Sequence, residues 1–342
     1  MKPPGHEPLL VYSNGKMHDL LSPVRKQILF YNVENLFDTK DDPETLDNEY
    51  LPRSAKKWDT ARYHTKINHI AKVIGSSGND LPVVVGLTEI ENDGVLGDLI
   101  GTDRLTPGKY QFIHYDSGDE RGMDVALLYR REYFRPLASQ PIPLTFPFDR
   151  TDRTRDVLYV KGQFRGEDTV HIFVNHWPSR REGVLESEPR RTFAARTVRQ
   201  FIQGILTDDP VAKILLMGDF NDPPDSYSLK KVLLVEPVSN SGNDNLINLA
   251  FPLFRKREGT INHRGRWLLF DQVIVSPSMI RPAAGISIPA GSFRIFDPSW
   301  LLFTHPRYHE KMPNKTYSGN EYHGGYSDHL PVYVSVNDLA AE

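Results

Sequence analysis

The sequence predicts a single α/β domain that follows a short N-terminal arm. Three observations predict it: apolar runs of strand length recur along the chain, amphipathic stretches lie between them, and several apolar runs end abruptly in acids, amides or histidines. A chain of 342 residues can form one α/β domain, and no repeat, low-complexity block or linker divides it. We therefore expect residues 1–26 to form a loosely held arm and residues 27–342 to form one domain.

The strands are placed in chain order from short apolar runs bounded by turn-forming residues. The expected strands cover residues 27–31, 82–87, 123–130, 156–164, 169–174, 214–217 and 330–336. Residues 260–276 indicate a hairpin that has Phe270 and Asp271 inside its second strand. The stretches 38–57 and 289–315 show no period, so we expect both to be irregular.

Three helices are expected between these strands. Asp59 or Thr60 can cap the first helix, and Gly75 can end it. Its apolar stripe consists of Tyr63, Ile67, Ile70, Ala71 and Ile74. A short helix is expected near residues 226–234, and a longer one over residues 187–206. Four arginines of the longer helix are expected to face largely outward, namely Arg190, Arg191, Arg196 and Arg199.

Composition excludes several classes of protein. Lys and Arg number 41 against 44 Asp and Glu, so the formal charge of −3 does not indicate a nucleic-acid binder, and any basic surface must be local. The absence of cysteine excludes disulfides, a thiolate nucleophile and cysteine-ligated zinc. No apolar run is long enough to span a membrane, and residues 1–26 lack a signal-peptide core. We expect a monomer without stable membrane insertion, cytoplasmic by default, whose export would need a leader outside this sequence.

The stretch 214–224 is the centre of the functional argument. Its apolar run ends in Gly218, Asp219, Phe220 and Asn221. Residues two apart in a strand point the same way, so Asp219 and Asn221 should face one pocket at the carboxyl end of the strand, where open α/β sheets bind their ligands. A carboxylate that accepts a proton from water and an amide that donates to an oxygen suit a phosphorus centre. The alternative is a simple Asx-type turn.

Polar side chains mark the ends of four other strands. They are Asn32, Glu89 and His176, together with Asp328 and His329 just before the last strand. Each of them alone is most often a turn or surface residue. Because strand ends converge on one edge of a sheet, their coincidence predicts one shared site.

Six short motifs follow one another along residues 27–336. They are Tyr31-Asn32-Val33-Glu34-Asn35, Thr88-Glu89, Asn175-His176-Trp177, Gly218-Asp219-Phe220-Asn221, Phe270-Asp271 and Ser327-Asp328-His329. Together they resemble the endonuclease/exonuclease/phosphatase superfamily, and more closely its bacterial nuclease-like members. The resemblance implies a DNase I-like four-layer α/β sandwich, in which two mixed β-sheets pack face to face with helices outside. It also implies divalent-metal-dependent hydrolysis of a phosphoester.

The same resemblance implies a metal site made of carboxylates. Glu89 is the expected ligand of Mg²⁺ (or Mn²⁺), a hard ion that takes oxygen ligands. Asp328 is expected to help hold that ion, directly or through water. Glu34 falls where some members place an extra metal-site carboxylate.

Catalytic roles follow from the resemblance as well. Asp219 is expected to orient or deprotonate the attacking water, and His329, backed by Asp271, to act as general base or to stabilise charge. The sequence leaves open which of the two is the base. The expected donors to phosphate oxygens are Asn32, Asn221, His176 and Arg155.

The leading hypothesis for the substrate is a nucleic acid, cleaved by a nuclease or phosphodiesterase. Local basic clusters such as Arg180 with Arg181 would supply affinity for a phosphate polymer. If this is correct, Arg155, Arg190 and Arg191 are expected to contact phosphates of the polymer.

The alternative substrate is a small-molecule, inositol or lipid phosphoester, cleaved by a phosphatase or phospholipase-like enzyme. Inositol polyphosphate phosphatases usually carry Trp-Cys-Asp-Arg where residues 267–271 have Trp-Leu-Leu-Phe-Asp. A lipid substrate would need an apolar hairpin, for which residues 300–303 are the candidate. An inactive binding protein of the same fold is a third possibility, disfavoured because all the polar strand ends are retained.

Overall fold

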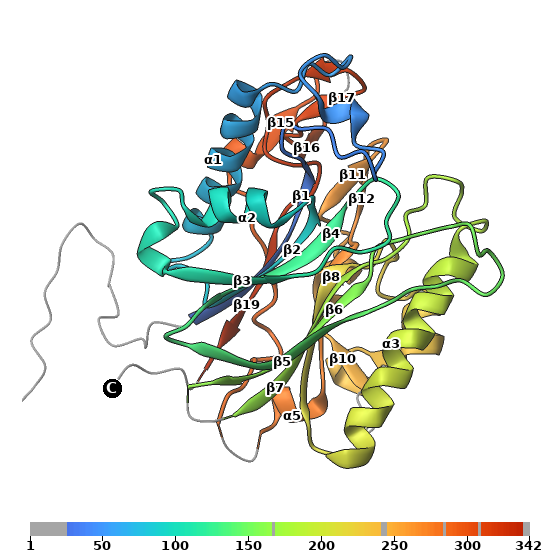
Figure 1. The fold of residues 1–342 in the computed structure, drawn as a ribbon. Helices are drawn as coiled ribbons and strands as arrows, with labels where there is room; N and C mark the ends of the chain where they lie inside the picture. Colours follow the sequence, from blue (N-terminus) through green and yellow to red (C-terminus); the bar gives the residue numbers. More distant parts are fainter. Residues whose placement is uncertain (1–25, 166–167, 241–244, 283–284, 307–308, 338–342) are drawn as a thin grey trace, which may run out of the picture.

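Two large sheets packed face to face form the body of the molecule (Figure 1). A computed structural model describes residues 26–165, 168–240, 245–282, 285–306 and 309–337. The arm expected over residues 1–26 lies, apart from Lys26, outside these described residues.

The first large sheet has the strand order β14-β19-β1-β2-β4-β3. Its strands are β1 Lys26–Leu36, β2 Val84–Ile90, β3 Tyr110–His114, β4 Asp124–Arg130, β14 Arg294–Ile295 and β19 Val332–Val336. β1 and β2 run parallel, whereas the other neighbours run antiparallel, so the sheet is mixed.

The second large sheet has the strand order β5-β6-β7-β8-β13-β10-β9 and is also mixed, because β7 and β8 run parallel while β8 and β13 run antiparallel. Its strands are β5 Phe134–Ile142, β6 Val157–Phe164, β7 Thr169–His176, β8 Lys213–Asp219, β9 Val235–Glu236, β10 Leu246–Asn248 and β13 Asp271–Val275. Three short pairs complete the strands: β11 Ile261–His263 with β12 Arg266–Leu268, β15 Leu302–Thr304 with β16 Lys311–Pro313, and β17 Tyr317–Ser318 with β18 Glu321–Tyr322.

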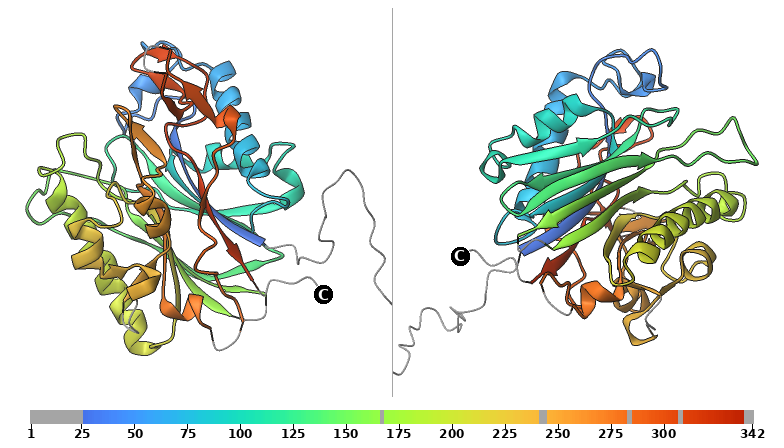
Figure 2. Two further views of the ribbon diagram at one scale, coloured as in Figure 1. Left: turned by 180° about the vertical axis from the view of Figure 1, so that it is seen from behind. Right: turned by 60° about the horizontal axis from the view of Figure 1, so that its bottom comes forward.

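Helices cover the outer faces of both sheets, which makes the expected four-layer sandwich. α1 Thr60–Ser76 and α2 Asp93–Ile100 lie on the first sheet, and α3 Glu188–Asp208 lies on the second (Figures 1 and 2). The remaining helical turns are α4 Phe251–Arg255, α5 Pro277–Ile280, η1 Asn48–Tyr50, η2 Thr106–Gly108, η3 Ser228–Leu233, η4 Val238–Asn240 and η5 Ser299–Leu301.

Alternation along β1 shows why the sheets pack as they do. Ile28 and Phe30 belong to the core between the two sheets, whereas Leu29 and Tyr31 pack in the cluster beneath α1. Successive side chains of a strand point to opposite faces, and both faces are covered here, so the run is apolar throughout. The local sequence therefore predicted this strand, although it extends beyond the expected residues 27–31.

The first helix begins and packs as expected. Asp59 is its N-cap and accepts a hydrogen bond from Arg62 N at 2.9 Å. The stripe that includes Tyr63, Ile67 and Ile70 is buried against the first sheet. α1 therefore holds the outer layer next to β1, whose end carries part of the candidate site.

Several expectations about elements were wrong or incomplete. The stretch 289–315, expected to be irregular, contains β14, η5, β15 and β16. The hairpin expected over residues 260–276 divides: β11 pairs with β12, while β13 leaves the hairpin and pairs with β8. Helix α2 was not expected, because Gly94 and Gly97 weaken its helical pattern. Its N-cap, Asn92, accepts from Val95 N at 3.0 Å. Sheet pairing is non-local, so the partner strand of β13 could not be predicted from the sequence of β13 alone.

Candidate active site

Asn32 joins the two large sheets at the edge where the polar strand ends meet. It lies on β1 and is fully buried. Its Nδ2 donates to Glu89 Oε1 at 3.2 Å and to Asp219 Oδ2 at 3.1 Å. Glu89 lies near the end of β2 in the same sheet, whereas Asp219 ends β8 in the facing sheet. One amide thus connects two carboxylates that belong to different layers.

Four residues around this edge have left-handed backbone conformations, which residues other than glycine rarely adopt. The φ angle is 54° for Glu34, 52° for Asn35, 65° for Glu89 and 49° for Asn221. The N–H of Glu34 donates to Asn32 Oδ1 at 3.0 Å, and that of Asn35 donates to Glu89 Oε2 at 2.8 Å. Such conformations persist only where their surroundings fix them. The side chains of the site therefore hold the end of β1 in this turn.

Gly218 allows the end of β8 to approach β7 closely. A Cβ at this position would lie 2.4 Å from Asn175 O and 2.6 Å from Asn175 Cβ, so no other residue fits. The next residue, Asp219, accepts a hydrogen bond at Oδ1 from Asn221 N at 2.9 Å. Asn221 Nδ2 in turn donates to Trp177 O at 2.9 Å. One hydrogen of the amide that was expected to bind phosphate thus ties the ends of β7 and β8 together.

His329 and Asp271 form the expected carboxylate–imidazole pair. His329 Nδ1 lies 2.7 Å from Asp271 Oδ2, and both residues are buried. Thr260 Oγ1 also donates to Asp271 Oδ2. The other ring nitrogen, Nε2, lies 3.8 Å from Asp219 Oδ2. The strand register that sets Asp271 opposite Asp219 builds this cluster.

Charge separates the roles of Asp219 and His329. Burial lowers the pKa of His329, but the Asp271 and Asp219 carboxylates outweigh burial and hold that pKa well above its usual 6.5. Burial raises the pKa of Asp219 to about 6, although the charge on His329 opposes the rise. Near neutral pH the imidazole is therefore charged, and the Asp219 carboxylate is largely ionised.

His176 lies between the two sheets with a neutral ring. Its Nε2 lies 3.8 Å from Glu89 Oε1 and 3.7 Å from Asp219 Oδ2. Burial, and then the positive charge of Arg155, lower the pKa of His176 well below 6.5. This ring is brought to the site as expected.

Arg155 does not fit the expected direct contact with phosphate. It is buried, and its Nη1 donates to Asp119 Oδ2 at 3.0 Å. Nε donates to His176 O at 3.1 Å, and Nη2 lies 3.1 Å from His176 Nε2 and 3.3 Å from Trp177 O. The guanidinium thus uses its nitrogens in contacts with other protein groups, and it influences the site by contacting His176.

Two carboxylates at the open side of the edge, Glu89 and Asp328, suit a hard divalent cation, and the buried Glu34 lies near them. The Glu89 side chain is 15 % exposed, and Asp328 beside it is half-buried. Burial raises the pKa of Asp328, and the charge on Glu89 adds to the rise. Burial and then Asp328 raise the pKa of Glu34 to about 7. This mutual repulsion in an all-oxygen donor set is the condition that Mg²⁺ or Mn²⁺ relieves.

Among the described residues, two groups of three side chains have the spacing of metal ligands, and neither contains Glu89 or Asp328. Asp219, Asp271 and His329 place ligand atoms within 4.8 Å of one another, but the short Nδ1 contact with Asp271 makes this a hydrogen-bonded group. The second group is His114, Asp116 and Asp124, on and beside β3 and β4. There His114 already contacts carboxylates through both ring nitrogens, at 2.8 Å to Asp93 and 3.3 Å to Asp124.

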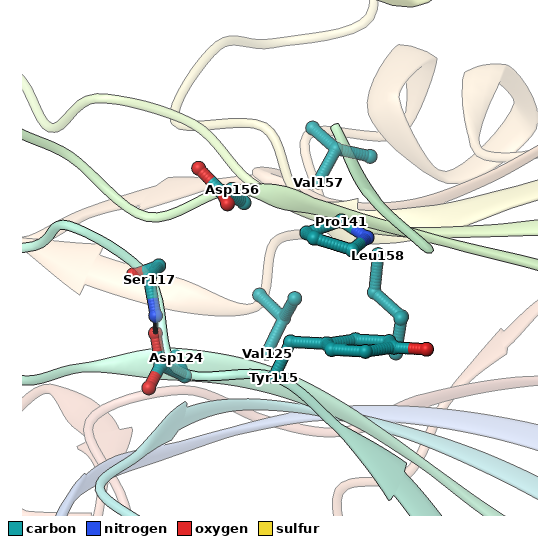
Figure 3. Close-up of a pocket in the computed structure, with 8 residues that line it drawn as sticks. All are labelled: Tyr115, Ser117, Asp124, Val125, Pro141, Asp156, Val157 and Leu158. Carbon is teal, nitrogen blue, oxygen red and sulfur yellow. Dashed lines mark hydrogen bonds between the residues drawn. The ribbon is translucent and has the colours of Figure 1, made fainter. Parts of the chain in front are cut away.

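Two cavities lie near the start of β4, and Asp124 lines both of them. A cavity of about 10 Å³ between Tyr115, Asp124 and Asp156 has room for about one water molecule and not for a substrate (Figure 3). A second cavity, of about 630 Å³, is lined by Asp119 and by six further carboxylates: Asp42, Glu44, Glu91, Asp116, Glu120 and Asp124. Because Asp119 also binds Arg155 beside His176, the larger cavity borders the candidate site.

Comparison with known proteins agrees with this geometry. The family model described as "Endonuclease/Exonuclease/phosphatase family" matches residues 27–338. The chain belongs to this family. It is therefore a phosphoesterase, in a family that generally uses a divalent metal, and the fold class implied by the six motifs is confirmed. No curated protein sequence matches the chain significantly.

Solved structures of the family share the fold at low sequence identity. A humanized TDP2 from D. rerio is 17 % identical, with a TM-score of 0.57 over 92 % of this chain and 99 % of that chain. A mannosyl-6-phosphatase from Bacteroides thetaiotaomicron is 16 % identical, with a TM-score of 0.55 over 91 % and 99 %. D. rerio TDP2 complexed with a single-strand DNA product is 16 % identical, with a TM-score of 0.52 over 92 % and 99 %.

The outward orientation expected for Arg190 and Arg191 was wrong for this family member. Arg191 is 1 % exposed, and its Nε lies 2.9 Å from Asp222 Oδ1. Arg190 contacts Glu182 at 2.5 Å and Asp149 at 3.2 Å. The helical period places Arg191 toward Asp222, whose position was not visible in the local sequence.

Sequence reasoning also missed residues that support the family's site. Lys66 lies on the apolar stripe of α1, and Thr260 holds Asp271 from the start of β11. A lysine among apolar stripe positions was a usable signal, because buried lysines are rare without a partner. Thr260 and Asp119 carried no such signal, since their partners are distant in sequence. Among the described residues, we find no helix with the length and apolarity needed to cross a bilayer.

Proposed function

We propose that this phosphoesterase is a Mg²⁺- or Mn²⁺-dependent nuclease or phosphodiesterase that hydrolyses phosphodiester bonds of nucleic acids. The observation that carries the reaction type is the Asn32 bridge, which joins Glu89 to Asp219 and thereby sets a metal-binding carboxylate beside a water-activating one. Glu89 and Asp328 would hold the metal ion. When bound there, the ion would polarise the phosphoryl oxygens and neutralise charge on the leaving group.

The charge states assign the base to Asp219. His329 is an imidazolium, which has no free lone pair, so it stabilises developing negative charge. Asp219 is largely ionised and takes the proton from water as the water oxygen bonds to phosphorus. The phosphorus–oxygen bond to the leaving group then breaks, and solvent protonates the leaving alkoxide.

Neutral side chains complete the site. The two hydrogens of the Asn32 amide are donated to Glu89 and Asp219 and hold these carboxylates beside each other, and the neutral His176 ring lies within 3.8 Å of both. Asp271 keeps the His329 ring in its orientation through the 2.7 Å contact at Nδ1. Arg155 orients His176 and supports its neutral state.

Two arginines at the rim support a substrate that extends beyond one phosphate. Arg121 is half-buried, and its Nε lies 3.9 Å from Asp119 Oδ1. Burial lowers the pKa of Arg121, as do the charges of Arg155 and Arg181, whereas Glu89 opposes the change. Arg121 is therefore within electrostatic range of both the exposed Arg181 and Glu89. A phosphate chain passing Glu89 would meet both arginines, and one similar structure holds a single-strand DNA product.

A panel of substrates tests this proposal. Plasmid DNA, single-stranded DNA, RNA, bis-p-nitrophenyl phosphate and p-nitrophenyl phosphate would be incubated with Mg²⁺, with Mn²⁺ and with EDTA. We expect metal-dependent cleavage of nucleic acid and of the diester, and much slower release from the monoester. Rapid hydrolysis of the monoester with intact nucleic acid would overturn the proposal.

The acidic cavity of about 630 Å³ favours a second candidate, a phosphatase acting on a small polyhydroxylated phosphoester. Its seven carboxylates repel a polyanion but accept hydrogen bonds from sugar hydroxyls. A similar structure is that of a mannosyl-6-phosphatase. Residues 300–303 support a lipid substrate only weakly: Leu301 is buried and Trp300 packs against Tyr326 at 5.1 Å between ring centroids, so Phe303, on the β15–β16 hairpin, is the one exposed apolar side chain of the four. Hexose 6-phosphates in the same panel distinguish this candidate.

A further inference from the structure

Lys66 is a buried cation on the apolar stripe of α1. It is 1 % exposed. Its Nζ donates to Thr316 Oγ1 at 2.6 Å and to Tyr326 O at 2.7 Å, and lies 3.6 Å from Glu34 Oε2. A carbonyl and a carboxylate can only accept, so the surroundings match the three donors of an ammonium group.

The surroundings of Lys66 are the acidic side of the candidate metal site. Burial lowers the pKa of Lys66, while the carboxylates of Glu34, Asp328 and Glu89 oppose that change. Burying an ammonium without a partner is strongly unfavourable, so Lys66 needs the charged and polar acceptors around it. Of these carboxylates, Glu34 is the one in ion-pair contact.

One oxygen of the Glu34 carboxylate is committed to Thr316 and Lys66. Its Oε2 accepts from Thr316 N at 2.7 Å and faces Lys66. Its own N–H is used by Asn32 Oδ1, within the left-handed turn that also presents Asn35 N to Glu89. Thr316 thus contacts both partners of the Lys66–Glu34 pair and holds them together.

We propose that the Lys66 ammonium takes the place of a second divalent cation, so that the site binds one metal ion, at Glu89 and Asp328, and Glu34 is not a ligand. The inference rests on the proposed metal site. The ammonium is held 3.6 Å from Glu34 Oε2 by Thr316 and Tyr326, so it already occupies the position of a counter-charge to that carboxylate. A second divalent ion beside a fixed ammonium would face strong repulsion at this short range.

Removing the charge of Lys66 tests the proposal. Metal-free protein would be titrated with Mn²⁺, with free ion followed by electron paramagnetic resonance and heat by calorimetry. We expect one tight site per chain in the wild type and in Lys66→Arg. Lys66→Met leaves Glu34 without its counter-charge, and we expect a second Mn²⁺ to bind. Lys72→Met is the matched control, because Lys72 lies on the same helix but contacts Tyr326 Oη at 2.9 Å, and it should keep one site.

Glu34→Gln keeps the proposal testable if Lys66→Met fails to fold. Because Glu34 is not a ligand, Mn²⁺ affinity should fall by no more than about tenfold, the lower end of effects outside the first coordination shell. Glu89→Gln should abolish measurable binding. Two tight sites in the wild type, one site in folded Lys66→Met, or loss of Mn²⁺ binding in Glu34→Gln would each overturn the inference. No Mn²⁺ binding to the wild type would instead refute the metal site of the proposed function.

Discussion

Asp219 Oδ2 and His329 Nε2 lie 3.8 Å apart and carry opposite charges, so the two groups titrate as a pair. Deprotonating His329 would leave Asp219 and Asp271 facing each other across a neutral ring. Protonating Asp219 would remove one of the two charges that hold the imidazolium. At the scale of single residues, the site therefore keeps one carboxylate and one imidazolium together near neutral pH.

Asp219→Asn should lower turnover by at least about a hundredfold, the usual scale for a general base. The substitution keeps the shape of the side chain and the hydrogen bond from Asn221 N, but it removes the proton acceptor. Steady-state rates on the substrate panel, with circular dichroism as a check of folding, measure the effect. Asp225→Asn, which changes an exposed acid in the same loop, is the control. A rate close to that of the wild type on every substrate would show that another group activates water.

The His329→Gln variant should reveal the imidazolium through the pH dependence of stability. The pKa of His329 is raised by folding, so its stabilising contribution is fully present below about pH 6.5 and is lost as pH rises through the folded pKa. The difference in Tm between wild type and variant, measured in EDTA, should therefore be largest near pH 6 and should shrink toward alkaline pH. A difference that grows with pH would mean that the ring is neutral in the folded protein.

At the scale of elements, α3 anchors the loop that follows β8. Arg191 reaches from the helix to Asp222, which also pairs with Arg180, and Arg191 Nη1 donates to Ser187 Oγ at 2.7 Å. Asp222 is 2 % exposed and its carbonyl accepts from Gln272 Nε2 on β13 at 2.6 Å. The helix thus supports the loop that starts at Asp219, and this role replaces the phosphate contact expected for Arg191.

Arg191→Met should lower the free energy of unfolding by about 3 kcal/mol, because it removes one partner of a buried ion pair. Urea denaturation at constant pH measures the change. Arg196→Met, an exposed position on the same helix, should change it by less than about 0.5 kcal/mol. Equal effects of the two substitutions would contradict the anchoring role of Arg191.

Local pattern predicted most of the long elements, because most long strands are covered on both faces and the long helices on one. The partly exposed β3 and β5 were not expected. β1, β2, β8 and α1 all follow from apolar runs or stripes with clear ends. Partners distant in sequence decided the rest. β13 leaves its expected hairpin to pair with β8, and Arg191 turns inward to meet Asp222.

The sequence predicted those residues of the candidate site that stand at the ends of strands, because strand ends converge on one edge. Asn32, Glu89, Asp219 and His329 are brought together as their positions before or after strands indicated. The exception is Arg155, whose guanidinium is taken up by Asp119 and the backbone. A residue type can indicate affinity for phosphate, but it does not reveal a competing carboxylate from another loop.

At the scale of the whole molecule, charge is unevenly placed around the edge. One side of the edge borders the acidic cavity that Asp119 and Glu91 line, and the rim also carries Arg121 and Arg181. A phosphate chain should avoid the carboxylates and follow the arginines. If the substrate is a nucleic acid, as we propose, electrostatics would set the direction of the bound chain independently of its sequence.

Arg121→Ala should weaken binding to single-stranded DNA uniformly across sequences and reduce the slope of its salt dependence by roughly one unit. Affinities measured in Ca²⁺ across a salt series give that slope. Arg190→Ala is the control, because its guanidinium is already paired with Glu182 and Asp149 and should leave the slope unchanged. An unchanged slope for Arg121→Ala would remove the rim arginine from the binding path.

Anomalous diffraction from a crystal soaked in Mn²⁺ tests the central claim most directly, because it locates the metal within the edge that the two sheets build together. We predict one strong peak, bound by Glu89 and Asp328 and separated from Glu34 by Lys66. A peak confined to the alternative groups, either Asp219, Asp271 and His329 or His114, Asp116 and Asp124, would contradict the claim.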